Sequence, residues 1–219
     1  MIDTAMHVGV WPDAVTTDAS GTALVSVVVT NLSDMIDAYA IEVLGIDEDW
    51  VEASESRVSL FPGESQQVDL TLQLPADSPA TDDRRVTVAV SSLNDHERFA
   101  LGTVNVTIPP VTALSIELDP TVVHGGRAAE FGIAVTNRGN SPARAVPFAT
   151  DPEATARFRF EPAEVNVAPG RTETVQVIAT GGRSWFGNPP ARTFTFGIAD
   201  EPPIAATATF VPRPRLPRW

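Results

Sequence analysis

The chain repeats three short landmarks in the same order and with nearly the same spacing. Val-Thr-Asn at residues 29–31 returns at 135–137, an offset of 106. The Pro-Gly dipeptide within 61–63 returns within 168–170, and the arginine-led segment 85–88 returns at 192–195, both at an offset of 107. Repetition at this period is typical of two copies of one folding unit, each about the size of an immunoglobulin-type sandwich. We therefore expect two small domains in tandem.

The residues around these landmarks have the patterns of β-strands. Residues 68–74 alternate apolar and polar side chains with a period of two, and residues 24–30 are mostly β-branched and apolar. Segment 36–44 is ambiguous between helix and strand, but its counterpart 143–148 carries Pro147, so we interpret both as strands. Further strands are expected at 86–90, 104–108, 131–136, 174–178, 193–198 and 206–211.

These patterns predict an all-β protein built from two tandem immunoglobulin-like β-sandwiches. The first sandwich is expected at 1–109 and the second at 110–212, followed by an arginine- and proline-rich tail at 213–219. Pro109 and Pro110 form a short, semi-rigid linker between them. Each Pro-Gly dipeptide predicts a tight turn, because proline fixes φ and glycine accepts a positive φ.

Several motifs in both units match one known kind of domain. The first unit reads Val-Val-Thr-Asn-Leu-Ser at 28–33, Asp-Trp-Val at 49–51 and Phe-Pro-Gly-Glu-Ser at 61–65. In these motifs the chain resembles the bacterial immunoglobulin-like modules of the alpha-galactosidase-associated and CARDB types. The resemblance implies that Trp50 packs in the core between the sheets rather than stacking on a sugar. The second unit lacks a tryptophan there, and Phe158 or Phe160 is expected to substitute.

Composition restricts the chemistry that the chain can perform. It has no cysteine, which excludes disulfides, zinc–thiolate sites and thiol nucleophiles, and no lysine, which excludes a Schiff-base or P-loop lysine. His7, His96 and His124 do not have the spacing of metal ligands, and there is no Gly-x-Ser-x-Gly motif. A spatial Ser/His/Asp triad stays open, but we interpret the chain as a protein that is not an enzyme and holds no cofactor.

Charge is divided unevenly between the two units. Residues 1–110 hold 18 Asp/Glu and 4 Arg, a net charge of −14, whereas residues 111–219 hold 10 and 11, a net charge of +1. The acidic half argues against nucleic acid as a partner, because phosphate contacts require basic side chains. Seven carboxylates fall in loops that such a sandwich gathers at one end: Asp18, Asp47, Glu48, Asp49, Asp77, Asp82 and Asp83.

Three interpretations of this acidic end are open. The carboxylates can pair across the domain junction with Arg138, Arg144 and Arg171 of the second unit, which would orient the two domains. They can instead bind Ca²⁺, for which Asp47, Asp49, Asp82 and Asp83 are the candidate ligands. They can also form a solvated rim that does neither.

The second unit is expected to gather aromatic and arginine side chains near the end of the chain. The residues concerned are Trp185, Phe186, Arg213, Arg215, Arg218 and Trp219. Arginines followed by an aromatic residue are typical of the flank of a transmembrane segment, which predicts a membrane anchor after Trp219 and a position at the cytoplasmic face. The alternative is a disordered tail on a soluble protein, with Trp185 in the core.

The leading functional hypothesis is a non-catalytic interaction or spacer region of a membrane-tethered bacterial protein, which presents loops or sheet edges to a protein partner. The alternative is a carbohydrate-binding or enzyme-accessory module at the cell surface. That alternative needs a row of exposed aromatic side chains on one sheet face. One tyrosine, Tyr39, and four tryptophans make such a row thin.

Overall fold

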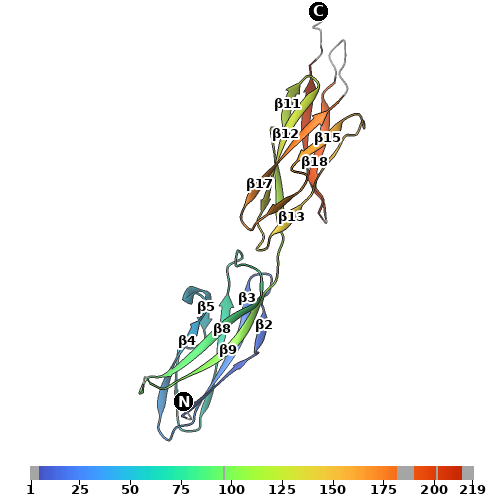
Figure 1. Ribbon diagram of the computed structural model, residues 1–219. Helices are drawn as coiled ribbons and strands as arrows, with labels where there is room; N and C mark the ends of the chain where they lie inside the picture. The colour runs from blue at the N-terminus through green and yellow to red at the C-terminus, as the bar shows by residue number, and fades with distance from the viewer. Residues whose placement is uncertain (1–4, 96, 182–189, 201, 214–219) are drawn as a thin grey trace, which may run out of the picture. The chain divides into compact units, whose positions relative to one another are not determined.

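The computed structural model describes residues 5–95, 97–181, 190–200 and 202–213. Within these ranges the chain is almost entirely β-strand and divides into two compact units, Met1–Pro110 and Val111–Trp219 (Figure 1). The predicted all-β sandwich fold is confirmed. The division between the units falls one residue after the position expected from the sequence.

The first unit is a sandwich of two sheets. One sheet has the strand order β1-β3-β7-β5 and the other has the order β2-β9-β8-β4-β6. The strands are β1 (Met6–Trp11), β2 (Ala14–Thr16), β3 (Thr22–Asn31), β4 (Asp37–Leu44), β5 (Val51–Ala53), β6 (Arg57–Leu60), β7 (Ser65–Gln73), β8 (Thr81–Ser92) and β9 (Phe99–Ile108).

The second unit has sheets of order β10-β12-β17-β15 and β11-β19-β18-β14, with the short pair β13-β16 beside them. Val146 separates β13 from β14, because β13 pairs with β16 whereas β14 pairs with β18. The single strand expected at 143–148 is therefore two strands. The strands are β10 (Leu114–Asp119), β11 (Val122–Gly125), β12 (Ala128–Asn137), β13 (Ala143–Ala145), β14 (Pro147–Thr150), β15 (Arg157–Glu161), β16 (Val165–Val167), β17 (Thr172–Thr180), β18 (Arg192–Ile198) and β19 (Ile204–Pro212).

The two units share the same pairing of their first strands. β1 pairs antiparallel with β3, and after the Trp11–Pro12 peptide, which is cis, β2 pairs parallel with β9 in the other sheet. In the second unit β10 pairs antiparallel with β12, and after the cis Asp119–Pro120 peptide β11 pairs parallel with β19. In both units, therefore, the first segment of chain crosses from one sheet to the other.

Each unit has its own hydrophobic core, and the two cores are chemically different. Alternate residues of β3 and β7 bury valine and leucine in the first unit, where Tyr39 is the largest fully buried side chain. The second core is aromatic: Phe194 and Phe196 contact Phe131 and Phe158, with ring centroids 4.9 to 6.4 Å apart. Such tilted and edge-on ring pairs contribute beyond their buried area.

The prediction that Trp50 packs in the core is wrong. Trp50 ends a short 3₁₀ turn, η1 (Glu48–Trp50), and it is only partly buried. The Asp47 carboxylate caps this turn by accepting a hydrogen bond from the Asp49 amide at 3.2 Å. The turn keeps Trp50 outside both sheets, where the guanidinium of Arg84 lies 5.9 Å from the ring centroid. Phe158 of the second unit, by contrast, does pack against its core.

The repeated Val-Thr-Asn and Pro-Gly landmarks meet in space. Asn31 is fully buried, and its amide nitrogen donates hydrogen bonds to the carbonyls of Met35 and Leu60 at 2.8 and 3.0 Å. Its backbone carbonyl accepts a hydrogen bond from the amide of Gly63, which has a φ of 75° and forms the expected tight turn. One asparagine thus joins the β3–β4 loop to the β6–β7 turn.

The second unit repeats this arrangement, in which a buried asparagine joins two loops and which we call the asparagine clamp. Asn137 is also fully buried and donates to the carbonyls of Ser141 and Val167 at 2.8 and 2.9 Å. Its backbone carbonyl accepts from Gly170, where φ is 68°. The landmarks recur in the sequence because each buried amide must find partners in the same two loops.

Candidate interaction surfaces

Large apolar side chains are exposed on the loops that the first asparagine clamp holds. Leu32, Met35 and Ile36 of the β3–β4 loop are 54%, 66% and 57% exposed, and Phe61 of the β6–β7 turn is 63% exposed. We call these four residues the apolar tip. Large apolar side chains exposed on neighbouring loops are typical of an interaction site.

The second unit builds the same loops without large apolar side chains at these positions. At the positions equivalent to Leu32, Met35, Ile36 and Phe61 it has Arg138, Ser141, Pro142 and Ala168. The backbone hydrogen bonds correspond as well: the amide of Leu32 donates to Ala5, and the amide of Arg138 donates to Ala113. Because the same scaffold forms in both units, the fold does not require the apolar tip.

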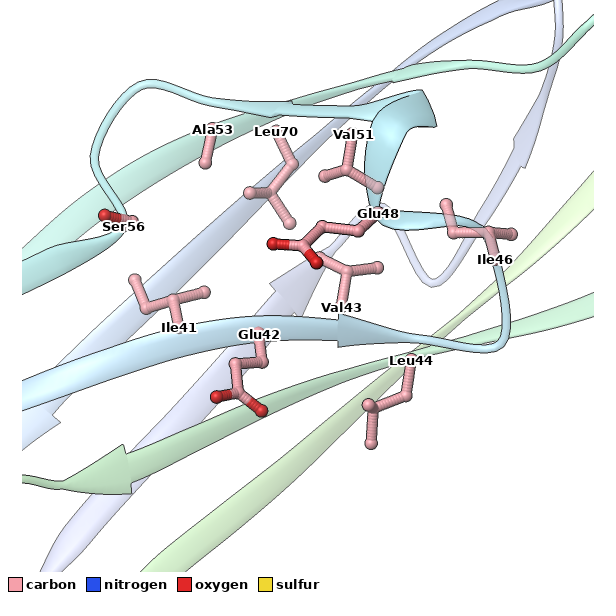
Figure 2. A pocket seen from close by; sticks show the side chains of 10 residues that line it. All are labelled: Ile41, Glu42, Val43, Leu44, Ile46, Glu48, Val51, Ala53, Ser56 and Leu70. Atoms are coloured by element: carbon pink, nitrogen blue, oxygen red, sulfur yellow. The ribbon is translucent and has the colours of Figure 1, made fainter.

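A pocket of about 510 Å³ opens at one side of the first sandwich (Figure 2). It lies between β4 of one sheet and β5 of the other, and the buried side chains of Ile41 and Leu70 line it. Val43, Val51 and Ala53 add half-buried apolar wall. Figure 2 shows the Glu48 side chain projecting into this space, whereas Glu42 points away from it. The pocket therefore combines apolar walls with one inward carboxylate.

Two strand edges border this pocket. β4 pairs with β6 only through Asp37–Ala40, and the amide of Ile41 donates to the carbonyl of Ser56 at 3.0 Å. Beyond Ile41, β4 keeps β8 on one side, and no described residue pairs with its other side. β5 is the last strand of its own sheet. An exposed edge offers unpaired N–H and C=O groups to an added strand.

Most of the carboxylates predicted at the acidic end do lie at one end of the first unit. Asp18 precedes β3, Asp47 and Asp49 follow β4, and Asp82 and Asp83 lie near the start of β8. Among the described residues, no group of three or more acidic or histidine side chains is arranged to hold a metal ion. Asp18 instead accepts from the Ser20 hydroxyl and from the amides of Ser20 and Thr22, and these hydrogen bonds, that of the Ser20 hydroxyl most of all, lower its pKa.

Arg138 and Arg171 are both exposed. Their loops are adjacent, as shown by the hydrogen bond that the backbone amide of Asn137 donates to the carbonyl of Arg171 at 3.0 Å. Arg144 lies on β13, where its Nε donates to Glu164 at 3.0 Å. This arginine is thus paired within its own unit. Pairing of the three arginines with the acidic end stays a prediction.

Of the membrane-proximal candidates only Arg213 is described, and its amide donates to the carbonyl of Gly125 at 2.6 Å. Trp185, Phe186, Arg215, Arg218 and Trp219 lie outside the described residues, as does His96. In the part of the chain that is described, no helix is long and apolar enough to cross a bilayer.

A buried ion pair in the second unit gave no signal in the sequence. Arg192 of β18 and Asp151 have side chains that are 10% and 3% exposed, and their charged atoms lie 2.5 Å apart. Burial raises the pKa of Asp151, but hydrogen bonds from the amides of Ala156, Thr155 and Glu153, together with the Arg192 charge, outweigh it, so the pKa lies below its usual value. The pair joins the loop after β14 to the start of β18 and is structural.

No family model and no curated protein matches the sequence. Among solved structures, the D00-D0 domain of intimin is 12% identical over 94% of this chain and 99% of that one, with a TM-score of 0.40. A protein of unknown function from Porphyromonas gingivalis W83 is 18% identical over 93% and 99%, with a TM-score of 0.34. A chaperone–tip adhesin complex of Acinetobacter baumannii is 13% identical over 77% and 89%, with a TM-score of 0.32. These scores identify no family and no function, and the particular types named from the motifs are not identified either.

Proposed function

We propose that the chain is a non-catalytic protein-interaction module and that the apolar tip of its first unit contacts the partner. One observation carries this proposal: four large apolar side chains are exposed on loops that the second unit builds with Arg138, Ser141, Pro142 and Ala168. Large exposed apolar side chains that the scaffold does not need are typical of a contact surface.

The surroundings of the tip indicate the chemistry of the partner. Asp34 and Glu64 are exposed beside it, and residues 1–110 carry a net charge of −14. Such a surface is repelled by anionic lipid headgroups but complements a protein whose apolar patch is bordered by Arg or Lys. The partner we propose is a protein of that kind.

Site-specific photo-crosslinking in the producing cells tests this proposal. We expect a photoreactive phenylalanine analogue at Phe61 to crosslink one discrete protein, and the same analogue at Ala168 to crosslink none. The pair is then reconstituted, and Met35→Ser with Phe61→Ala, which installs the residues of the second unit, is expected to weaken binding at least about tenfold. Equal products from both positions, or unchanged affinity of the double variant, would refute the proposal.

The membrane tether after Trp219, at the cytoplasmic face, is a further part of the proposal and is supported by the sequence of the tail alone. Flotation with liposomes measures it. Arg213→Gln, Arg215→Gln and Arg218→Gln together should abolish any preference of the chain for anionic over neutral vesicles, because about 1 kcal/mol per arginine is lost. If the wild-type chain binds neither kind of vesicle, the proposal that the tail docks on lipid headgroups is refuted.

A second candidate, carbohydrate binding at the cell surface, is favoured by one row of side chains. Trp11, 74% exposed, is the direct cross-strand neighbour of Ser26, which in turn is the neighbour of Asp69 on the same face. The Ser26 hydroxyl donates to Asp69 at 2.8 Å, so an aromatic ring lies beside a fixed polar pair. A glycan array with wild type and Trp11→Ala tests it, and binding that survives the substitution would argue against this row.

A further inference from the structure

The pocket between β4 and β5 has an unusual combination of walls. Its lining is mostly aliphatic and continues into the core of the first unit through Ile41 and Leu70. The exposed side chain of Glu48 projects its carboxylate into this space (Figure 2). Among the residues that the structure describes, no hydrogen bond or ion pair engages this carboxylate. It is therefore available to a ligand.

A side chain with an aliphatic stem and a cationic head matches such a pocket. Arginine and lysine pack their methylene groups against apolar surface while the charged end finds a carboxylate. The volume of about 510 Å³ is ample for one such side chain. Asp47 and Asp49 flank Glu48 in the sequence and are exposed, and their charges add negative potential, which favours a cationic ligand over a neutral or anionic one.

The strand edge beside the pocket indicates what carries that side chain. Because the amide of Ile41 points toward Ser56, the N–H and C=O groups of Val43, two residues further along β4, face the same side. No described strand pairs with Val43 on that side. An extended peptide can add to this edge with its backbone and place an alternate side chain in the pocket.

We propose that this pocket binds an Arg or Lys side chain from an extended segment of a partner protein, which adds to the edge of β4 beyond Ile41. This site is separate from the apolar tip. Its test uses a defined peptide, so its failure is distinguishable from failure of the proposed contact at the tip.

An NMR titration of the full chain with acetyl-Val-Thr-Arg-Val-Thr-amide tests the inference. We expect amide shifts concentrated in residues 41–53. The same peptide with citrulline in place of arginine keeps the shape but loses the charge, and should bind about tenfold more weakly. Peptides N-methylated at the arginine, or at the threonine or valine on either side of it, should lose binding when the methylated amide is one that pairs with β4.

Two substitutions that each remove one negative charge test whether Glu48 is the carboxylate that binds the arginine peptide. Glu48→Gln removes the inward carboxylate from a turn whose cap it does not form, and should weaken the arginine peptide about tenfold without affecting the citrulline peptide. Glu52→Gln, on the exposed face of β5, is the matched control and should change affinity less than about twofold. Absence of shifts at millimolar peptide, equal affinity for arginine and citrulline, or equal effects of the two substitutions would overturn the proposal.

Discussion

Removal of the buried asparagine of the first unit should destabilise that unit selectively. In Asn31→Ala, the carbonyl of Leu60 loses its partner in a buried position, which costs about 1–3 kcal/mol. Asn31 also makes a hydrogen bond to the Met35 carbonyl at 2.8 Å and accepts one from the Ser33 amide at 2.9 Å. Water can replace both, so the loss of each adds only about 0.5–1 kcal/mol to the destabilisation. We expect a total loss of about 2–5 kcal/mol.

Hydrogen exchange measured by mass spectrometry across a urea series resolves this loss by unit. Peptides of β3 and β7 should lose protection at lower urea, whereas those of β12 and β17 should not change, because each unit has its own core. Asn137→Ala should give the reverse pattern. Thr30→Val removes only an exposed hydrogen bond to Ser65 and should cost less than about 1 kcal/mol. A loss below about 1 kcal/mol in Asn31→Ala, or equal losses in both units, would refute the reasoning.

Other predictions concern single features of the two units. Asp151→Ala should cost about 3 kcal/mol in the second unit, measured by urea unfolding, because it leaves the mostly buried Arg192 charge with only the more distant carboxylate of Glu153, at 3.5 Å. The pKa of Asp151 is lower in the folded state than the unfolded value of about 4. The stability that its carboxylate contributes is therefore complete above the unfolded pKa and is lost as pH falls through the folded pKa. In acid, the second unit of the wild type should lose exchange protection more steeply than the second unit of Asp151→Asn. EDTA should leave the Tm unchanged, because the described residues bring no three metal ligands together; a fall in Tm would restore the calcium interpretation. Gly21→Ala should destabilise far more than Gly63→Ala in thermal unfolding, because both have positive φ but only at Gly21 would a Cβ meet a carbonyl oxygen, that of Leu74, at 2.2 Å.

Strand periodicity predicted most of this fold because the alternation of side chains is a local property. The burial of Val25, Val27 and Val29 on β3 follows directly from that alternation. The position of Trp50 did not follow, since a three-residue turn capped by Asp47 removed it from the strand pattern. The motif resemblance assigned that tryptophan to a core whose buried ring is Tyr39.

The candidate surfaces were less accessible to sequence reasoning. Leu32, Met35 and Phe61 looked like ordinary loop residues, and Ile36 fell within the strand predicted at 36–44, whereas β4 begins at Asp37. Their exposure is a property of the folded loops. They could have been found by aligning the two units and asking where large apolar residues stand opposite small or polar ones, as Phe61 stands opposite Ala168 and Met35 opposite Ser141. The pocket had no comparable signal, because Glu48 comes near Leu70 only when β5 pairs with β7, and β4 of the other sheet then forms the opposite wall.

The amino-acid sequence by itself determined the class of fold, the strand segments and the tight turns at Gly63 and Gly170, because each depends on the conformational preferences of neighbouring residues. Only the tertiary structure decided which strands form edges, where a carboxylate points into an apolar space, and that Arg192 meets Asp151 across 41 residues. These features arise from pairing and stacking between distant segments, and the free energy of such contacts depends on distances that no local pattern encodes.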